Sequence, residues 1–115
     1  FQALKILSTH PLIDSNRIAI SGWSLGGTVA LYSAWLPIAE VLAPTGERFA
    51  AHLPFYPAAH LRPEEMRWSE APILVLHGDI DDYTPLVLVT NFKDFMTQGF
   101  KDGILITVLK TVALD

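Results

Sequence analysis

A serine flanked by glycines is the first candidate for chemistry in this sequence. Residues 22–26 read GWSLG, which places Ser24 two residues after Gly22 and two residues before Gly26. This G-x-S-x-G spacing is typical of a nucleophile elbow, a strained strand-to-helix turn in which side chains at both glycine positions would collide. The backbone N–H of Leu25 can then donate to the oxyanion of a tetrahedral intermediate. We therefore predict that Ser24 is a catalytic nucleophile and that Leu25 supplies one oxyanion donor.

The same turn has two other interpretations. An ordinary glycine-rich turn between a strand and a helix would show a similar pattern, because glycine and serine are common. A phosphate-binding loop would need the G-x-x-x-x-G-K-[ST] motif, which the sequence lacks. The stretch IAIS before the serine and GGTVAL after it favour the elbow.

A second candidate is the acidic loop HGDIDDYTP at residues 77–85, directly after the apolar run ILVLH. Functional groups gather at the carboxyl ends of parallel strands, so this loop and Ser24 are expected at one edge of a sheet. One of its aspartates, Asp79, Asp81 or Asp82, could orient a catalytic histidine. Asp82 could instead favour the N-terminus of the next helix. Three close carboxylates could also bind calcium, but this loop lacks the glycine and the distant glutamate of an EF-hand. A further alternative is the D-x-D motif of phosphatases that use an aspartate as nucleophile.

The elements around these residues follow from apolar periodicity and from proline and glycine positions. Helices with three to four residues per turn and short apolar strands alternate along the chain. We expect helices at 1–9, 26–36, 62–67 and 84–98, strands at 17–21, 49–55, 73–77 and 104–109, and a loop at 37–48. Thr84 is the expected N-cap of the last helix, with Pro85 at its first position. This alternation predicts an α/β fold with a mostly parallel sheet and flanking helices.

Composition narrows the classes of function. The chain has 115 residues, half of them hydrophobic and 17% charged, as expected for one folded domain. Its net charge is −4 and no basic patch stands out, which argues against a nucleic-acid partner. It contains no cysteine, which excludes disulfides and thiolate metal sites. No apolar run reaches the roughly 18 residues of a membrane span. We expect neither a metal nor an organic cofactor.

The two motifs in this order and spacing resemble the α/β-hydrolase superfamily. Within it the sequence is most similar to the dienelactone hydrolase family, through NRIAI at residues 16–20, GWSLGG at 22–27, FYP at 55–57 and HGDIDDYTP at 77–85. The resemblance covers nearly the whole chain but only the C-terminal half of the family's domain. It implies that Ser24 is the nucleophile, Asp81 the acid and the Leu25 N–H an oxyanion donor. The family's eponymous enzymes carry cysteine where Ser24 stands, which points to a general ester hydrolase.

The resemblance also implies parts that these residues do not contain. It puts the catalytic histidine in a loop after the last strand, whereas the sequence there reads LKTVALD. It puts the second oxyanion donor and the first strands upstream of residue 1. We therefore expect residues 1–115 to be a fragment of one domain. His77 is expected to be structural and to bond to backbone near its strand end, and His10, His52 and His60 are weak candidates for the base.

Three functions remain open from the sequence. The first is a serine hydrolase that cleaves a small carboxylic ester or lactone through an acyl-enzyme. The second is a peptidase similar to prolyl oligopeptidase, and the third is a non-catalytic, truncated or degenerate gene product. For this chain alone we expect negligible esterase activity. Oligomeric state and compartment stay open, with the cytoplasm as the default expectation.

Overall fold

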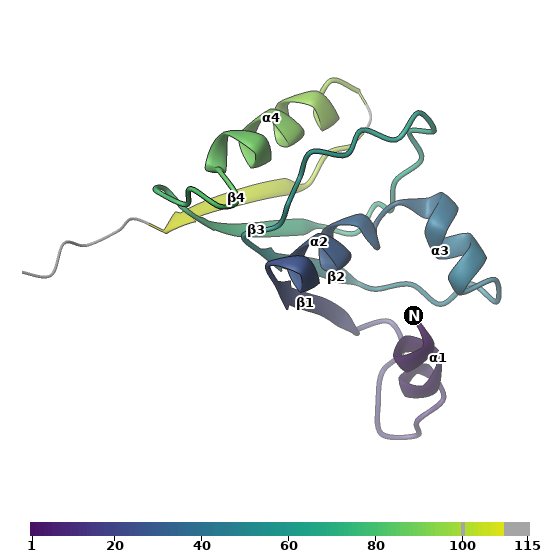
Figure 1. Cartoon of the computed structure of the whole chain (residues 1–115). Helices are drawn as coiled ribbons and strands as arrows, with labels where there is room; N and C mark the ends of the chain where they lie inside the picture. The colour runs from purple at the N-terminus through teal and green to yellow at the C-terminus, as the bar shows by residue number, and fades with distance from the viewer. Residues whose placement is uncertain (100, 110–115) are drawn as a thin grey trace, which may run out of the picture.

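The computed structural model describes residues 1–99 and 101–109, and it shows a four-stranded sheet with helices (Figure 1). The strands lie in the order β1-β2-β3-β4, and each neighbouring pair is parallel. All four carboxyl ends therefore meet at one edge of the sheet. The elements are α1 (Gln2–Ser8), β1 (Ala19–Trp23), α2 (Leu25–Tyr32), α3 (Leu36–Leu42), β2 (Ala51–Phe55), β3 (Ile73–Gly78), α4 (Leu86–Met96) and β4 (Ile104–Leu109). The predicted α/β class with a parallel sheet is confirmed.

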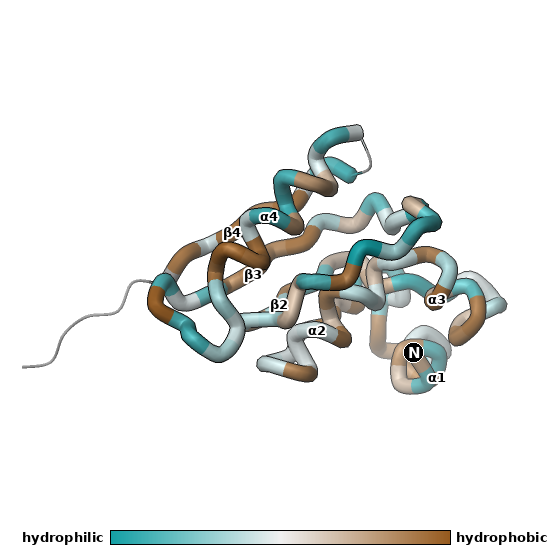
Figure 2. The backbone as a smooth tube through the Cα atoms, turned by 45° about the horizontal axis from the view of Figure 1, so that its top comes forward, coloured by the Kyte–Doolittle hydropathy of each residue, from teal (hydrophilic) through white to brown (hydrophobic). Residues whose placement is uncertain are grey.

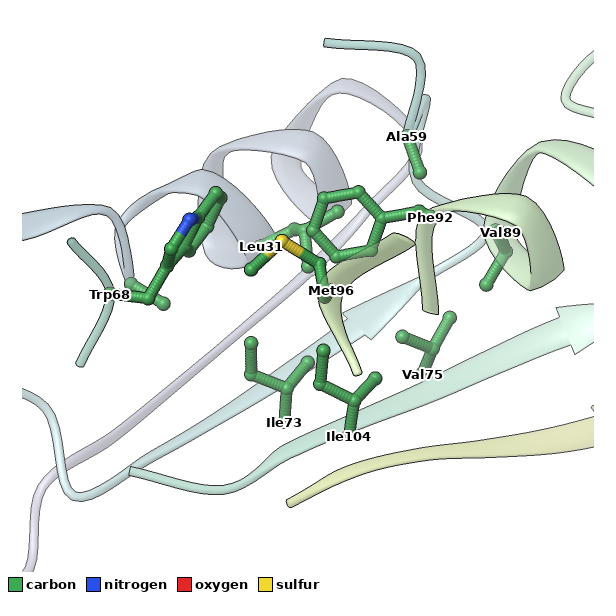
Figure 3. Packing of buried hydrophobic residues seen from close by; sticks show 10 residues of the cluster. Leu31, Ala59, Trp68, Ile73, Val75, Val89, Phe92, Met96 and Ile104 are labelled. Carbon is green, nitrogen blue, oxygen red and sulfur yellow. The ribbon is translucent and has the colours of Figure 1, made fainter. Parts of the chain in front are cut away.

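The core lies on one face of the sheet, between the strands and the helices α2 and α4. In β3 every second residue is fully or nearly fully buried, as the two-residue period of a strand requires. Figure 3 shows Phe92 and Met96 of α4 over Ile73 and Ile104 of the strands. The ring of Phe92 meets the ring of Trp68 edge-on, with centroids 5.8 Å apart. Val89, Phe92 and Met96 form the buried apolar face of α4, and Figure 2 shows hydrophobic and hydrophilic residues interspersed along this helix.

The other face of the sheet is more open. Its residues alternate with the core residues along each strand, and Trp23 of β1 and Leu105 of β4 are 57% and 61% exposed. Phe55 of β2 is only partly buried on this face, where its ring stacks on that of Trp23 at a centroid distance of 4.9 Å. Parallel sheets are usually covered on both faces, so this side is the less complete layer in the part of the chain that the structure describes.

The prediction of a loop at 37–48 was wrong, because α3 spans Leu36–Leu42. Pro37 lies in the first turn of this helix and does not follow the end of the preceding one directly. Proline is tolerated there because the N–H it lacks has no partner within the helix. The preceding helix ends earlier than expected, at Tyr32.

The prediction of a helix at 62–67 was also wrong. The segment is irregular, and two of its backbone carbonyls accept hydrogen bonds from a distant part of the chain. The indole N–H of Trp35 donates to the carbonyl of Glu65 at 2.7 Å, and the N–H of Leu36 donates to the carbonyl of Arg67 at 2.9 Å. These tertiary hydrogen bonds replace the local ones that a helix would have made.

Candidate active site

Ser24 lies at the junction of β1 and α2, in a backbone conformation that non-glycine residues rarely adopt. β1 ends at Trp23, α2 begins at Leu25, and Ser24 between them has φ 54° and ψ −114°. Such strain persists only where the surroundings impose it. Here the Ser24 N–H donates to the carbonyl of Phe55 at 3.1 Å, and the Ser24 carbonyl accepts from the N–H of Thr28 at 2.9 Å. The turn is therefore fixed by β2 on one side and by the first turn of α2 on the other.

Two glycines let this turn close, but they are not the two that the motif suggested. A Cβ on Gly22 would lie far inside contact distance of the Gly26 carbonyl, so Gly22 is required as predicted. A Cβ on Gly26 would meet nothing within 4 Å, so the predicted steric reason for Gly26 is wrong. The second crowded position is Gly27, whose Cβ would collide with the carbonyl of Phe55. The tight contact is between α2 and the neighbouring strand β2, which the pentapeptide alone does not show.

The hydroxyl of Ser24 and the N–H of Leu25 are both available for a ligand. Leu25 is the first residue of α2, and the N–H groups of a first turn have no acceptor within the helix. Among residues 1–99 and 101–109, none hydrogen-bonds to the Leu25 N–H or to the Ser24 hydroxyl. The positive end of the helix dipole adds to the attraction for an oxyanion at this point.

Asp81 is held in the loop after β3 by three hydrogen bonds. Its Oδ1 accepts from the N–H groups of Tyr83 at 3.0 Å and Thr84 at 2.8 Å, and its Oδ2 accepts from the Thr84 hydroxyl at 2.8 Å. The hydrogen bonds from Thr84 hold the pKa of Asp81 below its usual range. The carboxylate is therefore charged at neutral pH and keeps a fixed orientation, while its side chain is still 22% exposed.

The prediction of Thr84 as the N-cap of α4 was wrong. Pro85 occupies the N-cap position of α4, and no side chain caps that helix. The Thr84 hydroxyl, which would have capped it, donates to Asp81 instead.

Ser24 and Asp81 lie at the same edge of the sheet. Ser24 follows β1, Asp81 follows β3, and β2 lies between these strands. Adjacent strands are about 4.8 Å apart, so the two turns are separated by about 10 Å across the sheet. Figure 1 shows the start of α2 and the loop between β3 and α4 at the same end of the sheet. A histidine that bonds to both side chains would have to lie between these two turns.

His77 does not face Ser24. Its side chain is fully buried at the end of β3, and Nε2 bonds to the carbonyl of Thr84. The same Nε2 is 3.9 Å from Oδ2 of Asp81, and Nδ1 is buried with no partner among the described residues. The ring is thus enclosed, and its donor is used by backbone near the strand end, where a structural histidine was expected.

A buried serine–histidine pair was missed by sequence reasoning. Nδ1 of His52 on β2 is 2.9 Å from the hydroxyl of Ser33 and 2.9 Å from the carbonyl of Ala30, both at the C-terminal end of α2. Burial lowers the pKa of His52, so the ring stays neutral. Both side chains are buried, so this pair ties α2 to β2 and is closed to a substrate. The apolar residues around His52 gave no signal of it.

The two remaining histidines are exposed and distant in sequence from the site. Nδ1 of His10 accepts from the N–H of Leu12 at 3.1 Å, just after α1. His60 lies in the irregular segment between β2 and β3. Neither bonds to Ser24 or Asp81 among the hydrogen bonds of the described residues.

The larger cavities in the described part of the chain do not open at Ser24. One of about 410 Å³ lies near Trp68 and Lys101, at the amino ends of β3 and β4. Another, of about 310 Å³, is apolar, and its lining includes Val29 and Tyr32 of α2 and Ile38 of α3. The exposed aromatic groups nearest to the candidate site in sequence are Trp23 and Tyr83, which are 57% and 95% exposed.

The described residues contain no group of three or more side chains that could bind a metal ion. Among the helices that the structure describes, none has the length and apolar character needed to cross a bilayer.

The parallel sheet with a strained serine between a strand and a helix defines an α/β hydrolase. More specifically, the chain belongs to the Phospholipase/Carboxylesterase family, whose sequence model matches residues 3–111. No curated protein sequence matches it.

Solved structures of α/β hydrolases share the fold. The carboxylesterase Cest-2923 from Lactobacillus plantarum WCFS1 matches with a TM-score of 0.69 and 18% identity over 95% of this chain and 50% of that one. The hydrolase MGS-M1 from a deep-sea metagenome library matches with a TM-score of 0.66 and 21% identity over 96% of this chain and 45% of its own. An acylaminoacyl peptidase matches with a TM-score of 0.68 and 18% identity over 94% of this chain and 21% of its own. The chain thus spans about half of the length of the esterases it matches.

Proposed function

We propose that this chain is the C-terminal half of a serine hydrolase that cleaves carboxylic esters through an acyl-enzyme. The observation that carries this proposal is Ser24, held at φ 54° between β1 and α2 with its hydroxyl unbonded within the described residues. Family membership supports ester chemistry. The position of Asp81 at the same edge of the sheet supports a triad.

In the proposed mechanism, Ser24 Oγ attacks the carbonyl carbon of the ester while a histidine takes the hydroxyl proton. The negative charge that develops on the carbonyl oxygen is met by the N–H of Leu25 and by the N-terminus of α2. Asp81 orients the histidine and stabilises its charged form. The histidine then protonates the departing alcohol, and water attacks the acyl-enzyme by the same route.

We propose that the histidine lies outside the described residues. Its place in the triad cannot be taken by His77, because that ring is fully buried and bonded to Thr84. His52 is excluded for the same physical reason, since it is buried against Ser33 and Ala30. The second oxyanion donor is proposed to come from the part of the protein before residue 1.

We propose simple esters as the main substrates and lactones as secondary ones. The similarity to the dienelactone hydrolase family supports lactones, whereas serine at the nucleophile position supports ordinary esters. A peptidase activity is an outcome of the test below, since the fold is shared with an acylaminoacyl peptidase of low sequence identity.

The test uses the longer protein of which we propose this chain to be a part. It compares p-nitrophenyl esters, a lactone and a p-nitroanilide as substrates. We expect ester hydrolysis that disappears in Ser24→Ala and persists in Ser33→Ala, the matched control at a buried serine. Faster hydrolysis of the anilide than of any ester would favour the peptidase. Full ester turnover in Ser24→Ala would contradict the proposed function.

A further inference from the structure

His77 is a buried side chain that the proposed mechanism does not use. Its Nε2 must carry the hydrogen in the contact with the Thr84 carbonyl, because a carbonyl oxygen can only accept. In a neutral ring Nδ1 is then an acceptor, and it is buried without a partner among the described residues. A buried polar atom without a partner is costly and calls for an explanation. We attribute the burial of this ring to the hydrogen bond that its other nitrogen, Nε2, donates to the carbonyl of Thr84.

Thr84 links this ring to the carboxylate of Asp81. Its carbonyl accepts from His77, its N–H donates to Asp81 Oδ1, and its hydroxyl donates to Asp81 Oδ2. Both hydrogen bonds that Thr84 donates to Asp81 therefore depend on the position of the Thr84 backbone.

Two large side chains of this loop are mostly exposed to solvent. Ile80 is 66% exposed and Tyr83 is 95% exposed, so neither packs firmly against the rest of the chain. The fully buried ring of His77 is by contrast part of the strand β3. It is therefore the rigid end of the connection between the sheet and the acidic loop.

We propose that His77 is a positioning residue for Asp81: its buried ring fixes Thr84, and Thr84 fixes both oxygens of the carboxylate. The use of that carboxylate in a triad rests on the proposed function, whereas the coupling between the two residues does not. His77 acts through Thr84 and takes no proton from Ser24.

The test follows the Asp81 carboxyl carbon of this 115-residue chain by NMR over a pH titration. In the unaltered chain the pKa of Asp81 lies below its usual range, because Thr84 donates to the charged form. In His77→Leu we expect that pKa to rise toward its ordinary value. We also expect the amide hydrogens of Tyr83 and Thr84 to exchange about tenfold faster, the factor that one hydrogen bond of ordinary strength represents. His77→Gln should restore both, because its side-chain amide can still donate to Thr84.

His52→Leu is the matched control, since it also removes a buried histidine that bonds to a backbone carbonyl. It should lower the melting temperature and leave Asp81 unchanged. If His77→Leu does not fold, His77→Asn makes the same comparison, because its amide is too short to reach Thr84. An Asp81 pKa that does not change in His77→Leu or His77→Asn, or that changes equally in His52→Leu, would overturn the proposal. Coupling without ester hydrolysis would refute the proposed function alone, and hydrolysis without coupling would refute this inference alone.

Discussion

We predict that alanine at Gly26 and alanine at Gly27, both beside the turn that holds Ser24, affect the stability of the protein differently. Both residues lie in the first turn of α2, so alanine at either position gains up to about 1 kcal/mol of helix propensity. At Gly26 nothing opposes this gain, because a Cβ there has no atom within 4 Å. At Gly27 the new Cβ meets the Phe55 carbonyl oxygen, and neither backbone can move without opening the contact between α2 and β2.

The expected difference follows from the cost of overpacking, which is about 1–3 kcal/mol in well-packed interiors. Gly26→Ala should be neutral or slightly stabilising, and Gly27→Ala should be less stable than Gly26→Ala by that amount. Urea unfolding followed by circular dichroism measures the difference, and in a domain of this size 1 kcal/mol corresponds to about 4 °C in Tm. Gly22→Ala should resemble Gly27→Ala. Equal loss of stability in Gly26→Ala and Gly27→Ala would refute the steric reasoning.

Three further predictions concern catalytic activity and the pH dependence of stability. In the proposed longer protein, Asp81→Asn should lower kcat by up to about 10⁴-fold, as loss of the orienting carboxylate does in other triads, and unchanged kcat would exclude Asp81 as the acid. The 115-residue chain alone should give no measurable ester turnover above the buffer rate, and turnover that vanishes in His77→Ala would contradict this. Burial lowers the pKa of His52, so the unfolded chain binds its proton first as pH falls below the ordinary value of 6.5. The free energy of unfolding should therefore decrease from about pH 6.5 downward, and His52→Gln should flatten this part of the curve in urea titrations at several pH values.

The elements that the sequence predicted well are those whose signal is local. The strand at 104–109 matches β4, and the run ILVLH matches β3 to within one residue, because each is a continuous apolar stretch bounded by polar or turn residues. The face of α4 with Phe92 and Met96 follows from the helical period, and both residues are buried in the core.

The features that sequence reasoning missed depend on contacts between distant segments. Nothing within 62–67 shows that its carbonyls bond to Trp35 and Leu36, and those bonds decide its shape. The need for glycine at position 27 comes from β2, 28 residues away in the chain at Phe55, and not from the motif around Ser24. Threonine is a residue type that favours N-cap positions, yet the hydroxyl of Thr84 donates to Asp81, which precedes it in the folded loop. Local patterns fixed the position of the two motifs, and tertiary packing decided which groups in them are bonded.

The most direct test of the central claim is to locate the serine that reacts with a fluorophosphonate probe in the proposed longer protein. Trypsin should release residues 18–48 as one peptide, since the sequence has no lysine or arginine between Arg17 and Arg48. That peptide contains Ser21, Ser24 and Ser33, so fragmentation distinguishes the candidate nucleophile from an exposed and a buried serine of the same peptide. We predict that the adduct is on Ser24 and that Ser24→Ala abolishes labelling. An adduct on either of the other two serines, or labelling that persists in Ser24→Ala, would contradict the account.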